Sequence, residues 1–205
     1  MPHGIPRPTG RRRVHVISWR QLPWKLLWWL SPRENIDGIQ LGIAADRHDP
    51  TAVVDAVKAA LTLIRETDPH AYARVRGYLR GILVTEQSGG SFLFELEYCR
   101  LGVDLVLRGN PLALAMTIVH EVAHAELFAS GLAHRPEARE QEERYCVNRE
   151  IQFARQVAGS EEEIAVATAL LDTRWWEQAR MEATTIEELR RLGCPDWLIR
   201  LFKRA

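Results

Sequence analysis

The spacing of apolar residues along the chain predicts two helices in its first half. A helix is expected to begin at Asp49-Pro50, because aspartate is a favoured N-cap and proline is a favoured first helical residue. Asp68-Pro69 repeats this start signal for a second, shorter helix. In the first helix, apolar side chains recur at helical spacing and indicate the face that packs on the core: Val53, Val54, Val57, Leu61 and Ile64.

Four segments have the composition of strands. They span residues 36–43, 78–85, 92–98 and 101–107, and in the first of them Ile39, Leu41 and Ile43 alternate with other residues. The loop Ser88-Gly89-Gly90 is typical of a hairpin. The sequence therefore predicts a small, mainly antiparallel sheet of three to four strands in the N-terminal part of the chain.

Helices are predicted for most of the remaining residues. One is expected from Asn110-Pro111 to Gly131, and another over residues 136–158. Ser160 with a glutamate three residues later forms a capping-box pattern that starts a third. Two short helices are expected after Thr184 and after Pro195.

This order of elements predicts an α+β fold. The chain shows no internal repeat and no linker long enough to separate domains, so residues 1–205 are expected to form a single domain. Within it we distinguish a basic, tryptophan-rich arm (1–33), a core (34–158) and a helical extension (159–205).

Composition narrows the class of protein. The chain of 205 residues is 46% hydrophobic and 26% charged, which excludes collagen-like, low-complexity and disulfide-scaffold classes. No uninterrupted apolar run approaches the roughly 20 residues of a membrane-spanning helix. Three well-separated cysteines favour a reducing compartment, so we expect a cytoplasmic protein.

The arm carries a charge asymmetry. Residues 1–33 contain seven Lys or Arg and no Asp or Glu, whereas the net charge of the chain is zero, so the remainder is acidic. A globally basic nucleic-acid binder is therefore not expected. Four tryptophans also crowd into residues 19–29. Three interpretations of residues 11–30 stay open: a segment that covers the core, one that lies on a membrane surface, or one that docks a protein partner.

Residues 120–124, HEVAH, fit the pattern H-E-x-x-H within the helix predicted after Asn110. Four residues of α-helix turn through about 400°, so His120 and His124 project from one face, where they can share a Zn²⁺ ion. Glu121 is rotated by about 100° from His120 and is better placed to act as the general base that activates the attacking water.

A catalytic zinc site needs a third protein ligand. The chain departs from the metzincin pattern, because Leu127 stands where that pattern has glycine and Ser130 where it has its third histidine. The next predicted helix offers three carboxylates instead, from Glu140, Glu142 and Glu143. The residues alone leave open which of the three binds the metal.

At these positions the chain resembles the gluzincin metallopeptidases, in which a glutamate from a second helix completes the zinc site. Small members of that group often carry this glutamate in a pattern like E-x-x-A, and residues 143–146, ERYC, match it with Cys146 in the small-residue position. The resemblance implies that Glu143 is the third ligand, with Glu142 and Glu140 as alternatives. It covers about residues 75–158, is greatest to the minimal bacterial gluzincins (minigluzincins), and implies a zincin-like fold.

The resemblance also implies a function. It indicates a zinc-dependent metallopeptidase, a hydrolase of a peptide or protein substrate with Glu121 as its catalytic residue. In that fold an edge strand near the metal holds the extended substrate by backbone hydrogen bonds, and residues 92–98 or 101–107 are the candidates. The alternative is a zincin-like metal-binding domain that acts as a protein-interaction or membrane-surface module without catalysis.

Further residues are candidates for supporting roles. Peptide hydrolysis needs a group that stabilises the oxyanion, and His134, Tyr145 and Arg149 are near enough in sequence. Asn148 or Glu150 is a candidate to orient a ligand histidine. The three cysteines show no paired-ligand spacing and are interpreted as small apolar residues.

Overall fold

The structure is a computed structural model that describes residues 22–94, 96–133 and 138–173. The helices predicted after Thr184 and after Pro195, and residues 1–21 of the arm, lie outside the described residues. The elements follow in the order α1 (Leu22–Leu30), β1 (Arg33–Ile36), β2 (Ile39–Ala44), α2 (Pro50–Thr67), α3 (Pro69–Tyr78), β3 (Gly81–Thr85), β4 (Gly90–Leu93), β5 (Tyr98–Gly102), α4 (Val103–Arg108), α5 (Pro111–Ala129), α6 (Arg139–Ala154) and α7 (Glu161–Thr173).

The α+β class is confirmed, but the sheet differs from the prediction. It has five strands in the order β1-β2-β3-β5-β4, and it is mixed rather than mainly antiparallel. The outer pairs β1/β2 and β4/β5 are antiparallel, whereas β2/β3 and β3/β5 are parallel. The parallel pair β2/β3 arises because α2 and α3 form a crossover between the two strands, which returns the chain in the same direction.

All four predicted strands have different limits in the structure. The segment 78–85 is a strand only from Gly81, because Tyr78 is the last residue of α3. The segment 36–43 is split by a tight turn at Asp37 and Gly38, whose φ angles of 52° and 90° turn the chain back into an antiparallel hairpin. The segment 92–98 contains the end of β4 and the start of β5, separated by a turn. The segment 101–107 is the end of β5 followed by α4, in which Val103 and Val106 are buried at helical spacing.

The predicted helix starts are confirmed where the cap residues act locally. Asp49 and Asp68 accept hydrogen bonds from the backbone N–H of Thr51 and Ala71 at the starts of α2 and α3. Asn110 does the same for Ala113 in α5. Each cap satisfies a backbone N–H that has no partner inside its helix.

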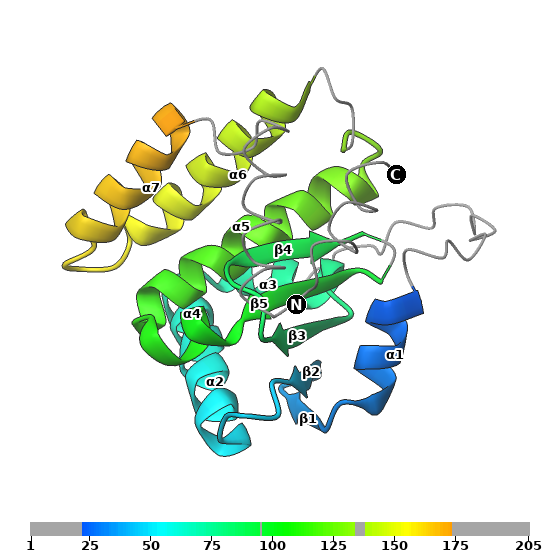
Figure 1. Cartoon of the computed structure of the whole chain (residues 1–205). Coiled ribbons are helices and arrows are strands. Elements are labelled where there is room, and N and C mark those ends of the chain that lie inside the picture. The colour runs from blue at the N-terminus through cyan, green and yellow to red at the C-terminus, as the bar shows by residue number, and fades with distance from the viewer. Residues whose placement is uncertain (1–21, 95, 134–137, 174–205) are drawn as a thin grey trace, which may run out of the picture.

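The helices cover the sheet in layers (Figure 1). The core lies between the sheet and α2, α3 and α5, whereas α6 packs on the outer side of α5 and α7 packs on α6. On the other face Gly42 and Gly81 leave room for the ring of Trp28 from α1, because a Cβ at either position would lie less than 3 Å from that ring. Trp28 thus covers the sheet, while Trp29 and Leu30 are exposed.

α5 is apolar on almost its whole circumference. By length and hydropathy alone this helix could cross a membrane, but 67% of its most apolar stretch is buried within the protein. The burial follows from its contacts with α2, α3, α6 and β4, which surround it.

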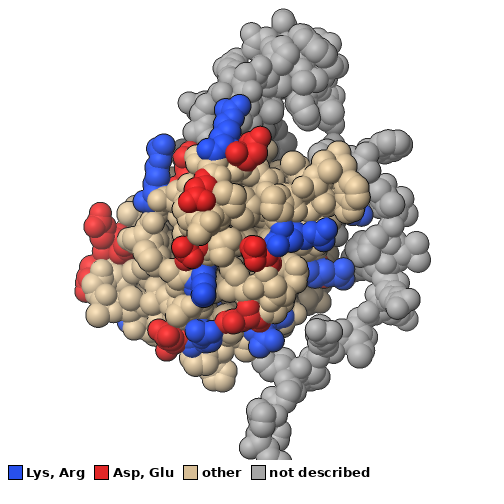
Figure 2. Space-filling view, turned by 90° about the horizontal axis from the view of Figure 1, so that it is seen from below, with Lys and Arg blue, Asp and Glu red and all other residues tan. Residues whose placement is uncertain are grey.

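On the molecular face in Figure 2, basic and acidic side chains of the described residues are intermingled, and neither sign gathers into a patch.

Candidate metal centre

The two histidines of the motif meet a glutamate from α6. His120 and His124 are both buried on α5, and their ring centroids lie 5.0 Å apart. Oε2 of Glu143 lies 3.5 Å from Nε2 of His120 and 3.5 Å from Nε2 of His124. Glu143 is fully buried, because it lies on the face of α6 that packs against α5. The fold therefore brings three possible ligand atoms together at one point inside the protein.

The spacing of these atoms fits a shared metal ion. Donors that bind zinc tetrahedrally at about 2.0–2.1 Å are separated from one another by about 3.3 Å. The two N···O distances of 3.5 Å are close to that value and longer than a good hydrogen bond. Neither carboxylate oxygen of Glu143 accepts a hydrogen bond of regular geometry in the described part of the chain. A buried carboxylate of this kind is chemically suited to bind a cation.

The remaining contacts of the cluster hold its members in place. Nδ1 of His120 lies 3.1 Å from Oε2 of the buried Glu150, one of the two residues predicted to orient a histidine. A metal ligand must be a neutral imidazole, and because a carboxylate only accepts, the neutral form of His120 would carry its proton on Nδ1 and direct the lone pair of Nε2 toward Glu143. Arg139 forms an ion pair with Oε1 of Glu143 at 2.8 Å.

The pKa values show how strongly the cluster is coupled. Burial by itself lowers the pKa of His120, but its close contacts with the carboxylates of Glu143 and Glu150 outweigh burial and raise that pKa to about 10. Burial likewise raises the pKa of Glu143, but the two histidines outweigh it and lower that pKa to about 2. Both shifts express one interaction, a buried cation beside a buried anion.

Glu121 lies apart from this cluster and faces the sheet. A Cβ built on Gly90, the first residue of β4, would lie 3.0 Å from Oε1 of Glu121. Burial raises the pKa of Glu121, although the positive charges of His120 and His124 lower it. A buried carboxyl with a raised pKa, directed at an edge strand, has the properties of a group that accepts and returns a proton.

The structure adds Arg100 on β5, which the sequence reasoning missed. This buried guanidinium donates a hydrogen bond from Nε to Ser91 Oγ at 2.7 Å and also binds the backbone carbonyl oxygens of Gln87 and Ser88. Its positive charge lowers the pKa of Glu121. A single arginine between apolar neighbours in a strand is a weak signal, because only tertiary structure brings it near the motif.

Cys146 is a fourth potential ligand. Its Sγ and one ring nitrogen each of His120 and His124 all lie within 4.8 Å of one another, and the side chain is buried. Burial raises the pKa of the thiol well above its ordinary value. The sequence interpretation of this cysteine as only a small apolar residue therefore leaves out its position beside the histidines.

The other predicted residues lie elsewhere or outside the description. Glu140 is on the exposed side of α6, where it accepts a hydrogen bond from Arg144 at 3.0 Å, and Glu142 is buried on the same helix. The Tyr145 hydroxyl lies 3.5 Å from Glu126, and the guanidinium of Arg149 lies over the Tyr145 ring. His134 lies outside the described residues. Tyr145 and Arg149, two of the candidates for stabilising the oxyanion, thus contact each other, and Tyr145 also contacts Glu126.

Comparisons with known proteins add no relative. No family model matches the chain, and neither a curated protein nor a solved structure does. The chemistry of the site therefore rests on the residues and distances given above.

Proposed function

We propose that the protein is a zinc-dependent peptidase of the gluzincin type, with a zincin-like fold in which His120, His124 and Glu143 hold the metal. The observation that carries this proposal is the position of Glu143 Oε2, at 3.5 Å from the Nε2 atoms of both histidines. Three protein ligands with one position left open are typical of a catalytic rather than a structural zinc site.

When bound by His120, His124 and Glu143, zinc would supply Lewis acidity and would lower the pKa of the attacking water toward neutrality. Glu121 then acts as general base: its carboxylate takes the proton of the attacking water and later returns it to the leaving amine. The raised pKa of this buried carboxyl favours the first step, because a stronger base takes the proton more readily, and it keeps that proton on Glu121 until the amine leaves. Glu150 holds the imidazole of His120 in the tautomer that offers Nε2 to the metal.

An extended peptide is the substrate class that best fits the surroundings of Glu121. β4 pairs only with β5 and is therefore an edge of the described sheet. Its first residue, Gly90, lies beside Glu121. A peptide that adds a strand along β4 would bring its backbone carbonyls past the proposed metal ligands. Of the two expected edge segments, residues 92–98 contain the end of this strand, whereas β5 lies inside the sheet.

The proposal is tested by metal content and by cleavage of a peptide library. The purified protein is expected to hold one zinc per chain by elemental analysis. Glu121→Gln should retain that zinc and lose hydrolysis by roughly 10²–10⁴-fold, the usual contribution of a general base. A protein without stoichiometric zinc, or a Gln variant that cleaves as fast as the wild type, would refute the proposal.

A second function is favoured by the position of Cys146. If its thiolate joins the two histidines and Glu143, the metal has four protein ligands and the site is closed. The domain would then be a metal-stabilised protein-interaction or membrane-surface module without catalysis. The cobalt-substituted protein distinguishes the two: a thiolate-to-cobalt absorption band that disappears in Cys146→Ala indicates the closed site, and its absence indicates the open one.

A further inference from the structure

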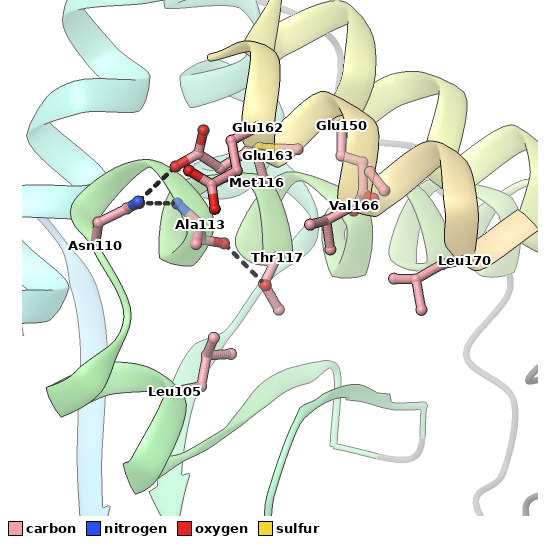
Figure 3. Close-up of a pocket in the computed structure, with 11 residues that line it drawn as sticks. Leu105, Asn110, Ala113, Met116, Thr117, Glu150, Glu162, Glu163, Val166 and Leu170 are labelled. Carbon is pink, nitrogen blue, oxygen red and sulfur yellow. Dashed lines mark hydrogen bonds between the residues drawn. The ribbon is translucent and has the colours of Figure 1, made fainter. Parts of the chain in front are cut away.

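A cavity of about 420 Å³ lies between α7 and the N-terminal half of α5 (Figure 3). Its walls combine apolar and acidic side chains from four helices. The apolar wall comes from α4, α5 and α7 and includes Leu105, Met116, Val166 and Leu170. Glu162 and Glu163 from the first turn of α7 lie at one end of it, above Asn110 (Figure 3). This volume lies in the range of roughly 300–1,000 Å³ that is typical of ligand pockets and is large enough to hold one long side chain.

The cavity adjoins the candidate metal centre through two residues. Thr117 lines the cavity one helical turn before Glu121, and its Cγ2 would lie 2.5 Å from a Cβ on Gly90 of the edge strand. Glu150 also lines the cavity, and it is the residue that binds Nδ1 of His120. A peptide laid along β4 beside Glu121 would therefore pass next to this cavity.

The charge of the cavity has one sign. Three of the described residues that line it are glutamates and none is Lys, Arg or His. Glu150 is engaged by His120, whereas Glu163 accepts a hydrogen bond from the uncharged amide of Asn110, with Nδ2 at 2.5 Å. Glu162 is exposed at the rim. An occupant with a long aliphatic stem and a cationic end would place its stem on the apolar wall and its charge beside the rim.

We propose that this cavity selects a Lys or Arg side chain of the peptide substrate, an inference that rests on the proposed peptidase function. The aliphatic stem would contact Met116 and Val166, and the ammonium or guanidinium group would pair with Glu162 and Glu163. The specificity of the enzyme is thus set largely by α7, which lies outside the part of the chain that resembles the gluzincins.

Binding to the inactive Glu121→Gln protein tests this separately from catalysis. Zinc-loaded Glu121→Gln is titrated into fluorescent peptides that differ at one position, with Lys, Arg, Leu or Glu there, and the Kd is measured by anisotropy. The Lys and Arg peptides should bind most tightly. When Glu162→Gln and Glu163→Gln are introduced together into the Glu121→Gln protein, the Kd of the Lys and Arg peptides should rise by about three- to tenfold, as expected for partly exposed ion pairs. The Kd of the Leu peptide should not rise.

Two further variants control for charge and space. Glu161→Gln removes the same charge from the same helical turn, but Glu161 does not line the cavity and its variant should leave the preference intact. Ala113→Leu places a larger side chain on the α5 wall and should weaken the Lys and Arg peptides more than one with alanine at that position.

The possible outcomes separate the two proposals. If the wild-type protein cleaves peptides but the four peptides bind alike, the cavity assignment is wrong and the peptidase proposal stands. It is equally wrong if Glu161→Gln lowers the cationic preference as much as the paired Glu162 and Glu163 variants do. If the preference is present in binding but no peptide is cleaved by the wild type, the cavity binds cationic side chains as assigned, but the peptidase proposal fails and with it the role of the cavity in substrate selection.

Discussion

α5 packs between two helices that present opposite kinds of surface to it. The buried positions of α2 are all apolar: Val53, Val57, Ala60, Leu61 and Ile64. On the other side, the contact with α6 buries four ionisable groups that touch one another: His120, His124, Glu143 and Glu150. One helix thus joins an ordinary hydrophobic core to a buried cluster of charges.

The difference supports the proposal that the interface between α5 and α6 binds a ligand. Burying a charge costs several kcal/mol, and a well-packed apolar set of similar volume often stabilises a protein at least as well. The α2 side shows that this chain can provide such a set. The charges between α5 and α6 therefore support the proposed metal site, in which neutral imidazoles and a carboxylate bind the ion.

The largest expected effect comes from removing the carboxylate at the centre of the cluster. Glu143→Ala leaves His120 and Arg139 without their buried partner, so the free energy of unfolding of the metal-free protein should fall by about 3–5 kcal/mol. The variant should also lose stoichiometric zinc. Urea denaturation and elemental analysis measure the two effects.

Glu140→Ala is the matched control for Glu143→Ala, because it removes the same side chain from the exposed face of α6. Its ion pair with Arg144 is exposed, so the change in stability should stay within about 0.5 kcal/mol. The reverse result, with zinc lost in Glu140→Ala and kept in Glu143→Ala, would show that the ligand assignment is wrong.

A smaller effect should appear when pH, rather than mutation, removes the charges. In the chelator-treated protein, the pKa of Glu143 is lowered to about 2 from 4.5, so its contribution to stability is present above pH 4.5 and lost as pH falls toward 2. The pKa of His120 is raised to about 10 from 6.5, so its contribution is present below pH 6.5 and lost as pH rises toward 10.

The metal-free protein should therefore be most stable between about pH 4.5 and 6.5. Zinc requires neutral histidines, so the gain in Tm on adding zinc should grow from pH 6 to pH 8. Thermal unfolding followed by circular dichroism, with chelator and with zinc, measures both trends. A metal-free protein whose Tm rises steadily up to pH 9 would mean that the cluster is not coupled as described.

The next effect concerns the residue behind the histidine. Glu150→Ala removes the acceptor of the His120 Nδ1 proton without removing a proposed ligand. Zinc affinity should fall by about 10–100-fold, as is typical when the partner of a ligand histidine is lost. Competition with a chromophoric chelator measures this, and Asn148→Ala, an exposed residue of the same helix, is the control. Equal zinc affinities of the two variants would show that Glu150 does not support the metal site.

The fold could be predicted from sequence where the signals are local. The starts of α2, α3 and α5 depend on cap residues that act within three positions. The strand pairings depend on contacts between distant segments, and residues 101–107 are misassigned because a short apolar run fits either a strand or a helix. The hairpin at Asp37 was missed although Asp37-Gly38 is a local hairpin signal, because the apolar residues on both sides were assigned to one strand.

The same distinction applies to the candidate site. The approach of His120 and His124 follows from their spacing on one helix. On α6, Glu150 lies one turn after Cys146 and two turns after Glu143, so the three residues share one face of that helix. The rotation of α6 against α5, which brings Glu143 rather than Glu140 to the histidines, depends on tertiary packing. Arg100 and Gly90 reach Glu121 from the sheet, at sequence distances where no spacing rule applies.

The smallest expected effect tests the apolar side of the comparison. Ile64→Val removes one methylene group from the fully buried face of α2 and should lower the free energy of unfolding by about 0.5–1.5 kcal/mol. Because α2 contributes no ionisable group to its buried face, the loss should be the same at pH 5 and pH 8 and the same with and without zinc. Urea denaturation under these four conditions measures it. If the loss depended on zinc, the two sides of α5 would be energetically coupled, and the metal centre would extend its influence through the helix into the hydrophobic core.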